Sequence, residues 1–217
     1  MLKEDMQKLI AEQEGGRQMN TVPMVIKKTA DGDKAMDIAS RLLDDNIILL
    51  TGEINDMIAE VVIAQLLYLD SLGKGEPIHI YINSPGGSVT AGLAIMDTMK
   101  LIESKIYTYC IGLAASMGAI ILSSGDKRYI VPHAEVMIHQ PLGGTKGQAS
   151  DIEIAAEHIS RTKKTLNSIL AENCHRLYDE VSRDTERDNW KSAEEALDYG
   201  LVDKIISSLD ELKNGDL

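Results

Sequence analysis

From residue 46 to residue 113 the sequence alternates between short segments typical of buried strands and longer segments with helical spacing. The strand-like segments, rich in Ile, Leu and Tyr, are residues 46–54, 77–87 and 105–113. The helix-like segments between them are residues 55–73 and 89–103. Regular alternation of strand and helix requires crossover connections, which pair the strands in parallel. The sequence therefore predicts an α/β fold with a mostly parallel sheet.

The second half of the chain predicts shorter strands and one long helix. Residues 127–131 and 135–139 are expected to form strands, and a Gly-rich loop follows at residues 141–148. The apolar spacing then predicts a helix from Ser150 to about Cys174. Ser150 has a glutamate three residues after it, which is typical of a capping pair at a helix start.

Two shorter segments complete the prediction. Residues 38–45 have apolar positions at helical spacing. Ser192 and Glu195 form a second capping pair, which predicts a short helix ending at Gly200. Residues 201–206 are expected to form a final strand.

The composition argues against several kinds of partner. A net charge of −12 disfavours nucleic acid and anionic membranes, which bind clusters of Lys and Arg. No segment approaches 18 consecutive apolar residues, so we expect no membrane span. The charged N-terminal segment lacks the apolar core of a signal peptide, which favours a cytoplasmic location. Two cysteines indicate neither a disulfide framework nor a zinc site, so no metal is expected.

Two segments combine small residues with polar groups in a way that suits nucleophilic chemistry. Residues 112–122, GLAASMGAIIL, hold Ser116 among alanines and glycines, where it is either a packing residue or a nucleophile. Residues 83–89, NSPGGSV, predict a tight turn between a strand and a helix, because Gly86 and Gly87 permit backbone angles that side chains forbid. The N–H groups of such a turn can hold an oxyanion, although a plain strand-to-helix turn has the same sequence pattern.

A serine nucleophile requires a base, and a base histidine requires an orienting acid. Among the five histidines, His139 is the best candidate because it ends a short apolar strand and Pro141 then turns the chain away. Residues 184–188, DTERD, offer three carboxylates: Asp184, Glu186 and Asp188. Chemistry alone does not choose among the three, and ordinary surface charge explains them equally well.

Four long segments together resemble the caseinolytic protease family, ClpP. They are residues 82–99, 112–125, 137–154 and 184–205, and the resemblance extends in register from about Val22 to Ile206. It implies the ClpP/crotonase-like fold, a repeated β-β-α superhelix with a protruding strand–helix handle. The implied activity is that of a self-compartmentalised serine endopeptidase that degrades unfolded polypeptides.

The resemblance also implies a role for individual residues. Ser116 would be the nucleophile, His139 the general base and Asp188 the acid that orients it. The backbone N–H groups of Gly87 and Met117 would form the oxyanion hole. The residues implied in substrate binding are Gly86, Pro141, Gly143 and Gly144.

Domain organisation and partners follow from the same resemblance. Residues 1–20 would be a tail or propeptide-like segment, and residues 21–217 a single protease domain with an axial loop at about 21–34 and a handle at about 140–175. Family members assemble as two stacked heptameric rings that receive substrate from an AAA+ unfoldase such as ClpX, ClpA or ClpC. ATP would be used by that partner only, so the chain is expected to need no cofactor.

The pocket implied in ATPase docking departs from the family pattern. It would contain His79, Tyr81, Leu101 and Tyr129, and His79 and Leu101 stand at positions that are commonly aromatic. The departure leaves a second hypothesis open, in which the chain is a weakly active or inactive paralogue that provides docking surface in a mixed complex. A third is an acyl-CoA enzyme of the related crotonase fold, which would use the paired N–H groups for an enolate.

Overall fold

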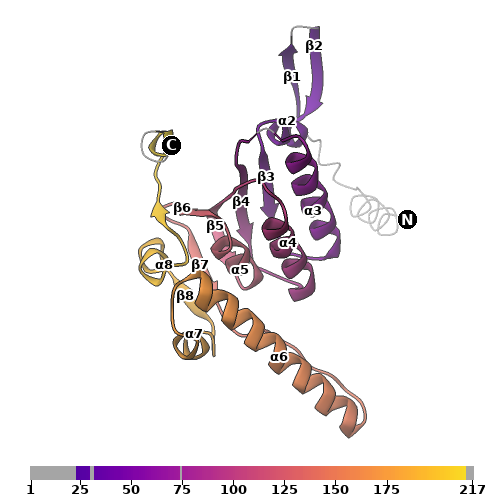
Figure 1. The fold of residues 1–217 in the computed structure, drawn as a ribbon, viewed down its shortest axis with the longest axis vertical. Helices are drawn as coiled ribbons and strands as arrows, with labels where there is room; N and C mark the ends of the chain where they lie inside the picture. The colour runs from indigo at the N-terminus through magenta and orange to yellow at the C-terminus, as the bar shows by residue number, and fades with distance from the viewer. Residues whose placement is uncertain (1–22, 30–31, 74, 214–217) are drawn as a thin grey trace, which may run out of the picture. The chain divides into compact units, whose positions relative to one another are not determined.

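A computed structural model describes residues 23–29, 32–73 and 75–213, and the expected tail at residues 1–20 lies outside them. Contacts between Cα atoms divide the chain into two compact units, Met1–Leu42 and Leu43–Leu217. The described part of the first unit is a hairpin followed by a helix (Figure 1). The second unit contains the sheet, the remaining helices and all the candidate site residues.

In the first unit, two antiparallel strands occupy most of the segment that the family resemblance implies as an axial loop, at about 21–34. β1 (Met24–Thr29) pairs with β2 (Gly32–Asp37) along their whole length. Helix α2 (Ile38–Asp44) follows directly and is the helix predicted at residues 38–45. The Ser40 hydroxyl and N–H both donate to the carboxylate of Asp37, and these bonds lower the pKa of Asp37.

The second unit is built on a parallel sheet, as the alternating sequence predicts. Its main path runs β3 (Ile47–Thr51), β4 (Ile78–Ser84), β5 (Ile106–Ala115), β6 (Lys127–Ile130) and β9 (Lys204–Ile205). All four pairings along this path are parallel. The mixed α/β fold class is thereby confirmed, although β9 covers only two residues of the segment predicted as the final strand.

Strand β5 has two different neighbours on the same side. Its first half pairs with β6, and its last three residues pair in parallel with β7 (Glu135–Ile138). β7 in turn pairs antiparallel with β8 (Asn189–Lys191), where Met137 lies opposite Trp190. The carboxyl ends of β5 and β7 therefore meet, and the residue before β8 lies at the same edge.

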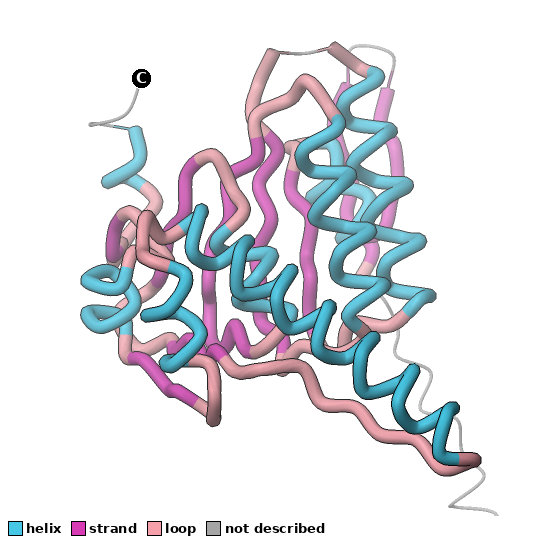
Figure 2. Tube along the Cα trace, turned by 60° about the horizontal axis from the view of Figure 1, so that its bottom comes forward, coloured by secondary structure: helices cyan, strands magenta, loops and turns pink. Residues whose placement is uncertain are grey.

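Three helices cover one face of this sheet (Figure 2). They are α3 (Asp56–Ser71), α4 (Val89–Leu101) and α5 (Met117–Ser123), and every residue of α5 is buried. Alternate residues of the strands, such as Ile80 and Ile82 of β4, point toward these helices and are fully buried. The chain contains no Phe, and the core is mostly aliphatic, with Tyr199 contributing an aromatic ring.

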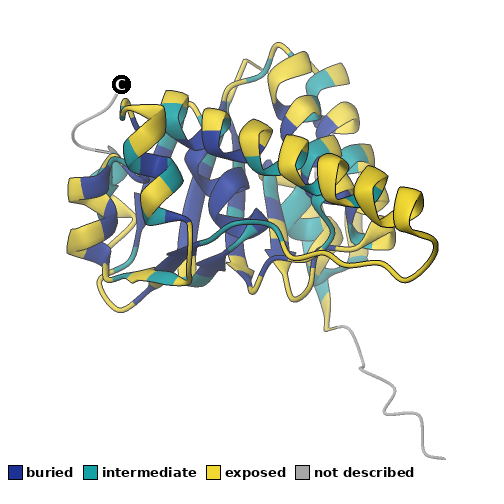
Figure 3. Ribbon diagram, turned by 90° about the horizontal axis from the view of Figure 1, so that it is seen from below, coloured by how far each residue is buried: buried dark blue, intermediate teal, exposed yellow. Residues whose placement is uncertain are grey.

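The long helix α6 (Ala149–Asn173) projects away from the sheet, with its first half mostly exposed (Figures 1 and 3). Its second half returns to the core, where Leu166 and Leu170 are buried. The predicted capping role of Ser150 is wrong. The helix begins one residue earlier, after Gln148, and no side chain caps it, so Ser150 lies inside the first turn.

Three short helices complete the second unit: α7 (Tyr178–Asp184), α8 (Ala193–Tyr199) and α9 (Asp210–Lys213). The capping pair Ser192 and Glu195 opens α8 as predicted, and Gly200 ends it with a left-handed φ of 89°. No helix in the described ranges combines the length and hydropathy that a membrane crossing requires.

Candidate active site

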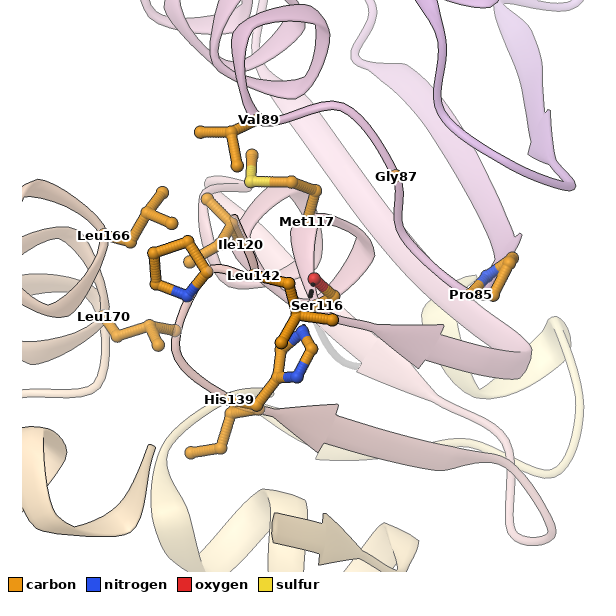
Figure 4. A pocket seen from close by; sticks show the side chains of 12 residues that line it. Pro85, Gly87, Val89, Ser116, Met117, Ile120, His139, Leu142, Leu166 and Leu170 are labelled. Atoms are coloured by element: carbon orange, nitrogen blue, oxygen red, sulfur yellow. Dashed lines mark hydrogen bonds between the residues drawn. The ribbon is translucent and has the colours of Figure 1, made fainter. Parts of the chain in front are cut away.

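The fold brings three side chains from distant parts of the sequence into one hydrogen-bonded chain. Ser116 follows β5, His139 follows β7, and Asp188 precedes β8. The Ser116 Oγ lies 2.8 Å from His139 Nε2, and His139 Nδ1 lies 3.0 Å from Asp188 Oδ1. Both distances suit hydrogen bonds. The imidazole can therefore accept the proton of the hydroxyl while the carboxylate holds the other ring nitrogen. Figure 4 shows Ser116 and His139 facing each other at one wall of a pocket.

Ser116 has an unusual backbone conformation for a packing residue. Its φ is 54° and its ψ is −120°, at the point where β5 ends and α5 begins. Non-glycine residues rarely adopt positive φ, and such strain is concentrated at functional sites. The Ser116 N–H donates to Met137 O on β7, which fixes the turn against the strand that carries the base. The sequence lacks the G-x-S-x-G motif, but this sharp strand-to-helix turn presents the serine in a similar way.

The structure separates the three acidic candidates that the sequence left open. Asp188 contacts His139. Asp184 instead accepts a hydrogen bond from the Tyr199 hydroxyl at 2.9 Å. Glu186 accepts from Lys163 Nζ at 2.6 Å, and this bond with its charge lowers the pKa of Glu186. Within the described residues, Asp188 is the acid placed to orient the imidazole.

The turn at Gly86 and Gly87 lies directly beside Ser116. Ile54 N–H donates to Gly86 O, and Ile54 O accepts from Ser88 N–H, both at 2.8 Å, so a short parallel bridge holds the turn. Its φ angles are 90° at Gly86 and 150° at Gly87, both favourable to glycine. A Cβ at Gly86 would lie 2.6 Å from the Ser116 Cβ.

Two N–H groups beside the serine remain available for a ligand. Within the described residues, neither the Gly87 N–H nor the Met117 N–H donates to a protein acceptor. Met117 is the first residue of α5, where N–H groups have no partner within the helix. Paired N–H groups next to a serine hydroxyl are what an oxyanion hole requires.

An apolar cavity of about 220 Å³ opens beside the serine and histidine. Ser116 and His139 line one side of it (Figure 4). Pro141 also contributes to its wall. The remaining lining is mostly aliphatic and consists of Pro85, Gly87, Val89, Met117, Ile120, Ile138, Leu142, Leu166 and Leu170. Sequence reasoning missed this cavity. Its signal lies in the apolar spacing of the long helix, from which we predict only the helix itself.

The two other residues implied in substrate binding lie beyond this cavity. Gly143 lies in the loop before α6 and packs against Ile159, whose Cδ1 would be 2.8 Å from an added Cβ. Gly144 has open space around it, since an added Cβ would have no atom within 4 Å. Both glycines therefore belong to the loop that leaves the cavity along α6, and neither forms its wall.

Three of the four residues implied in ATPase docking gather on the sheet face opposite the helices. Tyr81 and Tyr129 stack on Tyr109, with ring centroids 4.5 and 5.0 Å away. His79 Nδ1 lies 2.8 Å from the Tyr109 hydroxyl, and burial lowers the pKa of His79. Leu101 ends α4, is 79% exposed and is absent from this aromatic cluster. Within the described chain Leu101 therefore lies apart from the other three residues, and the docking role of the four stays a prediction.

No described group of three or more His, Cys, Asp or Glu side chains has an arrangement that could hold a metal ion. Cys110 and Cys174 are both buried and free. Burial raises the pKa of each thiol to about 11. Neither thiol is therefore a ready nucleophile at neutral pH.

A comparison with protein-family models gives one match over most of the chain. The family described as Clp protease matches residues 30–209 of the 217. The matched range includes every residue of the serine, histidine and aspartate chain and of the adjacent glycine turn.

Proposed function

The chain belongs to the Clp protease family of serine peptidases, and we propose that it cleaves unfolded polypeptides through an acyl-enzyme on Ser116. One observation carries the proposal. Ser116, His139 and Asp188 form a continuous hydrogen-bonded chain, and two N–H groups without protein acceptors lie beside its serine end. Nucleophile, base, orienting acid and oxyanion donors are the complete set that acyl transfer to serine needs.

The proposed reaction follows from this arrangement. His139 Nε2 accepts the Ser116 proton as Oγ attacks the substrate carbonyl, and the carbonyl oxygen becomes an oxyanion. The N–H groups of Gly87 and Met117 donate to that oxyanion. His139 then gives its proton to the departing amine, which breaks the peptide bond and leaves the acyl group on Ser116. Water, activated by His139, attacks the ester and releases the second product. Asp188 holds the imidazole in the required tautomer throughout.

The apolar cavity supports a preference for an apolar side chain at the substrate residue before the cleaved bond. Because the wall is aliphatic, a Leu or Met side chain placed there would be desolvated without leaving a polar group unpaired. Burying such a side chain contributes about 1.5–3 kcal/mol. Peptides with Leu at this position should therefore exceed matched peptides with Lys in kcat/KM by about 10- to 100-fold.

The loop that leaves the cavity supports binding of the substrate as an extended strand. Residues 141–147 form neither helix nor strand in the structure, and their backbone runs beside α6 (Figure 2). Main-chain hydrogen bonds near Gly143 and Gly144 would hold substrate with little regard to its sequence. Such tolerance suits a protease whose selectivity comes from restricted access.

We further propose that the chain assembles as two stacked heptameric rings and receives substrate from an AAA+ unfoldase that uses ATP. Family membership supports this assignment. Tyr81 and His79, which are partly exposed beside the buried Tyr109, offer a candidate contact surface for the partner. Native mass spectrometry of the full chain, alone and with a candidate unfoldase, would test both the ring size and the partner.

Labelling with a fluorophosphonate tests the nucleophile directly. The full-length protein should label at one serine and cleave a short Leu-containing peptide. Ser116→Ala should abolish both, while Ser168→Ala, which changes an exposed serine of α6, should preserve both. Labelling that persists in a folded Ser116→Ala variant would refute the proposal. A folded wild-type protein that assembles but neither labels nor cleaves would instead support the docking-subunit hypothesis.

A further inference from the structure

We propose that Gln140, Glu186 and Lys163 are positioning residues, which fix the acid of the catalytic chain relative to its base. The inference rests on the proposed function, because it assigns these three side chains a task in the same reaction. None of them lies within hydrogen-bond distance of Ser116 or His139 in the described structure. Their effect would pass through Asp188.

Few contacts hold the side chain of Asp188 in place. Its side chain is 63% exposed, and the one hydrogen bond that it makes within the described residues is to His139. It lies in the short segment between α7 and β8. The direction of its carboxylate therefore depends on how residues 185–188 are held.

Gln140 holds this segment from the residue next to the base. Its N–H donates to Thr185 O at 2.6 Å, and its side-chain Nε2 donates to Glu186 O at 2.8 Å. On the other side of the histidine, Ile138 pairs with Asn189 in the β7–β8 ladder. Bonds from Gln140 and Ile138 thus fix the main chain before and after Asp188, which sets the separation between acid and base.

Lys163 connects the same segment to α6. Its Nζ lies 2.6 Å from Glu186 Oε2, and Gln140 Nε2 also approaches Glu186 Oε1 at 3.3 Å. One helical turn later, Asn167 Oδ1 accepts from the buried Thr185 hydroxyl at 3.0 Å. Residues four apart lie on the same face of a helix, so α6 holds two consecutive residues of the segment.

A plain surface ion pair is the competing explanation for Lys163 and Glu186. Such pairs contribute little to stability, because water screens the charges and the side chains lose freedom. A positioning role makes a different prediction. Removing the pair should leave the melting temperature nearly unchanged but slow the chemical step, since a small misplacement of a catalytic group can slow a reaction about 100-fold.

The first test compares four variants of the full-length protein in hydrolysis of a short peptide. Gln140→Met and Lys163→Met should each lower kcat by about 10- to 100-fold while KM and assembly stay unchanged. Lys163→Arg keeps the charge and should restore most of the rate. Lys164→Met removes a neighbouring exposed lysine of α6 as the matched control and should match wild type. Wild-type kcat in both Gln140→Met and Lys163→Met would overturn the inference.

The second test asks whether the effect passes through the acid. In an Asp188→Ala background, Gln140→Met and Lys163→Met should cause no further loss of kcat, because the carboxylate that they position is absent. Equal losses in both backgrounds would show an independent role and refute the inference. If Ser116→Ala retained activity, the proposed function would fail. If Ser116→Ala were inactive while the positioning variants matched wild type, the further inference alone would fail.

Discussion

Replacing Gly86 with alanine should disable the nucleophile while leaving the fold intact. An added Cβ would lie 2.6 Å from the Ser116 Cβ and 2.7 Å from Ala115 O. Ordinary contact begins at 3.4 Å, so the turn and the serine must separate by about 0.8 Å. Displacements near 1 Å can slow a reaction about 100-fold, which corresponds to about 2.7 kcal/mol in the barrier.

The left-handed backbone at Gly86 adds a separate cost to stability. Alanine at a φ of 90° is strained by about 1–2 kcal/mol relative to glycine. Gly73→Ala is the matched control, since its φ is 59° and an added Cβ would have no atom within 4 Å. Both variants should show this backbone cost in thermal unfolding, and Gly86→Ala should lose further stability because its Cβ also clashes. Only Gly86→Ala should lose activity.

The assay is the rate of fluorophosphonate labelling together with kcat for a short peptide. Labelling isolates the reactivity of the serine from later steps of turnover. A Gly86→Ala protein that labels within a few-fold of the wild-type rate would refute the close approach of turn and nucleophile. Equal loss of activity in Gly73→Ala would attribute the effect to general destabilisation.

Three further predictions concern the cavity, the acid stability and the core. Leu166→Ala should enlarge the apolar cavity and shift the preferred residue before the cleaved bond from Leu toward Phe. Rates with matched Leu and Phe peptides measure this, and an unchanged preference would contradict binding of that side chain in the cavity. Hydrogen bonds from the hydroxyl and N–H of Ser104 lower the pKa of Asp70, so their contribution to stability is present above the ordinary aspartate pKa of about 3.9 and is lost as pH falls further. The melting-temperature deficit of Asp70→Asn should accordingly shrink between pH 6 and pH 3, whereas a constant deficit would contradict the linkage. Arg128, nearly buried, donates to the half-exposed Asp203 and to two main-chain carbonyls, so Arg128→Met should lower the free energy of unfolding by about 1.5–3 kcal/mol in urea titrations; a loss below about 0.5 kcal/mol would show that the network is dispensable.

The fold was predictable where local patterns decide it. Strand-like and helix-like segments alternate strongly between residues 46 and 113, and their parallel pairing follows from the crossover rule. The start of α6 was not predictable in the same way. Ser150 with Glu153 resembles a capping box, but the residues before it already adopt helical geometry from Ala149. A capping pair marks a helix start only when the backbone of its first residue is extended rather than helical.

In the candidate site too, some residues can be identified from the neighbouring sequence and others only from how distant segments pack. His139 could be selected from its neighbours in sequence, because it ends a short apolar strand before Pro141. The neighbours of Ser116 leave it open between a packing residue and a nucleophile. The choice of Asp188 over Glu186 rests only on the family resemblance, since two residues of similar chemistry differ here only in their distance from the start of β8 at Asn189. The sequence of one strand does not show which distant strand it will pair with. The cavity lined by Leu166 and Leu170 likewise depends on how α6 packs back against the sheet.

The single tryptophan of the chain has a useful position. Trp190 is 51% exposed and lies in β8, opposite Met137 and two residues after Asp188. Its emission therefore arises entirely from the strand that follows the acid. The wavelength and quenching of this one indole give an optical signal that reports rearrangement of that strand without any added fluorophore.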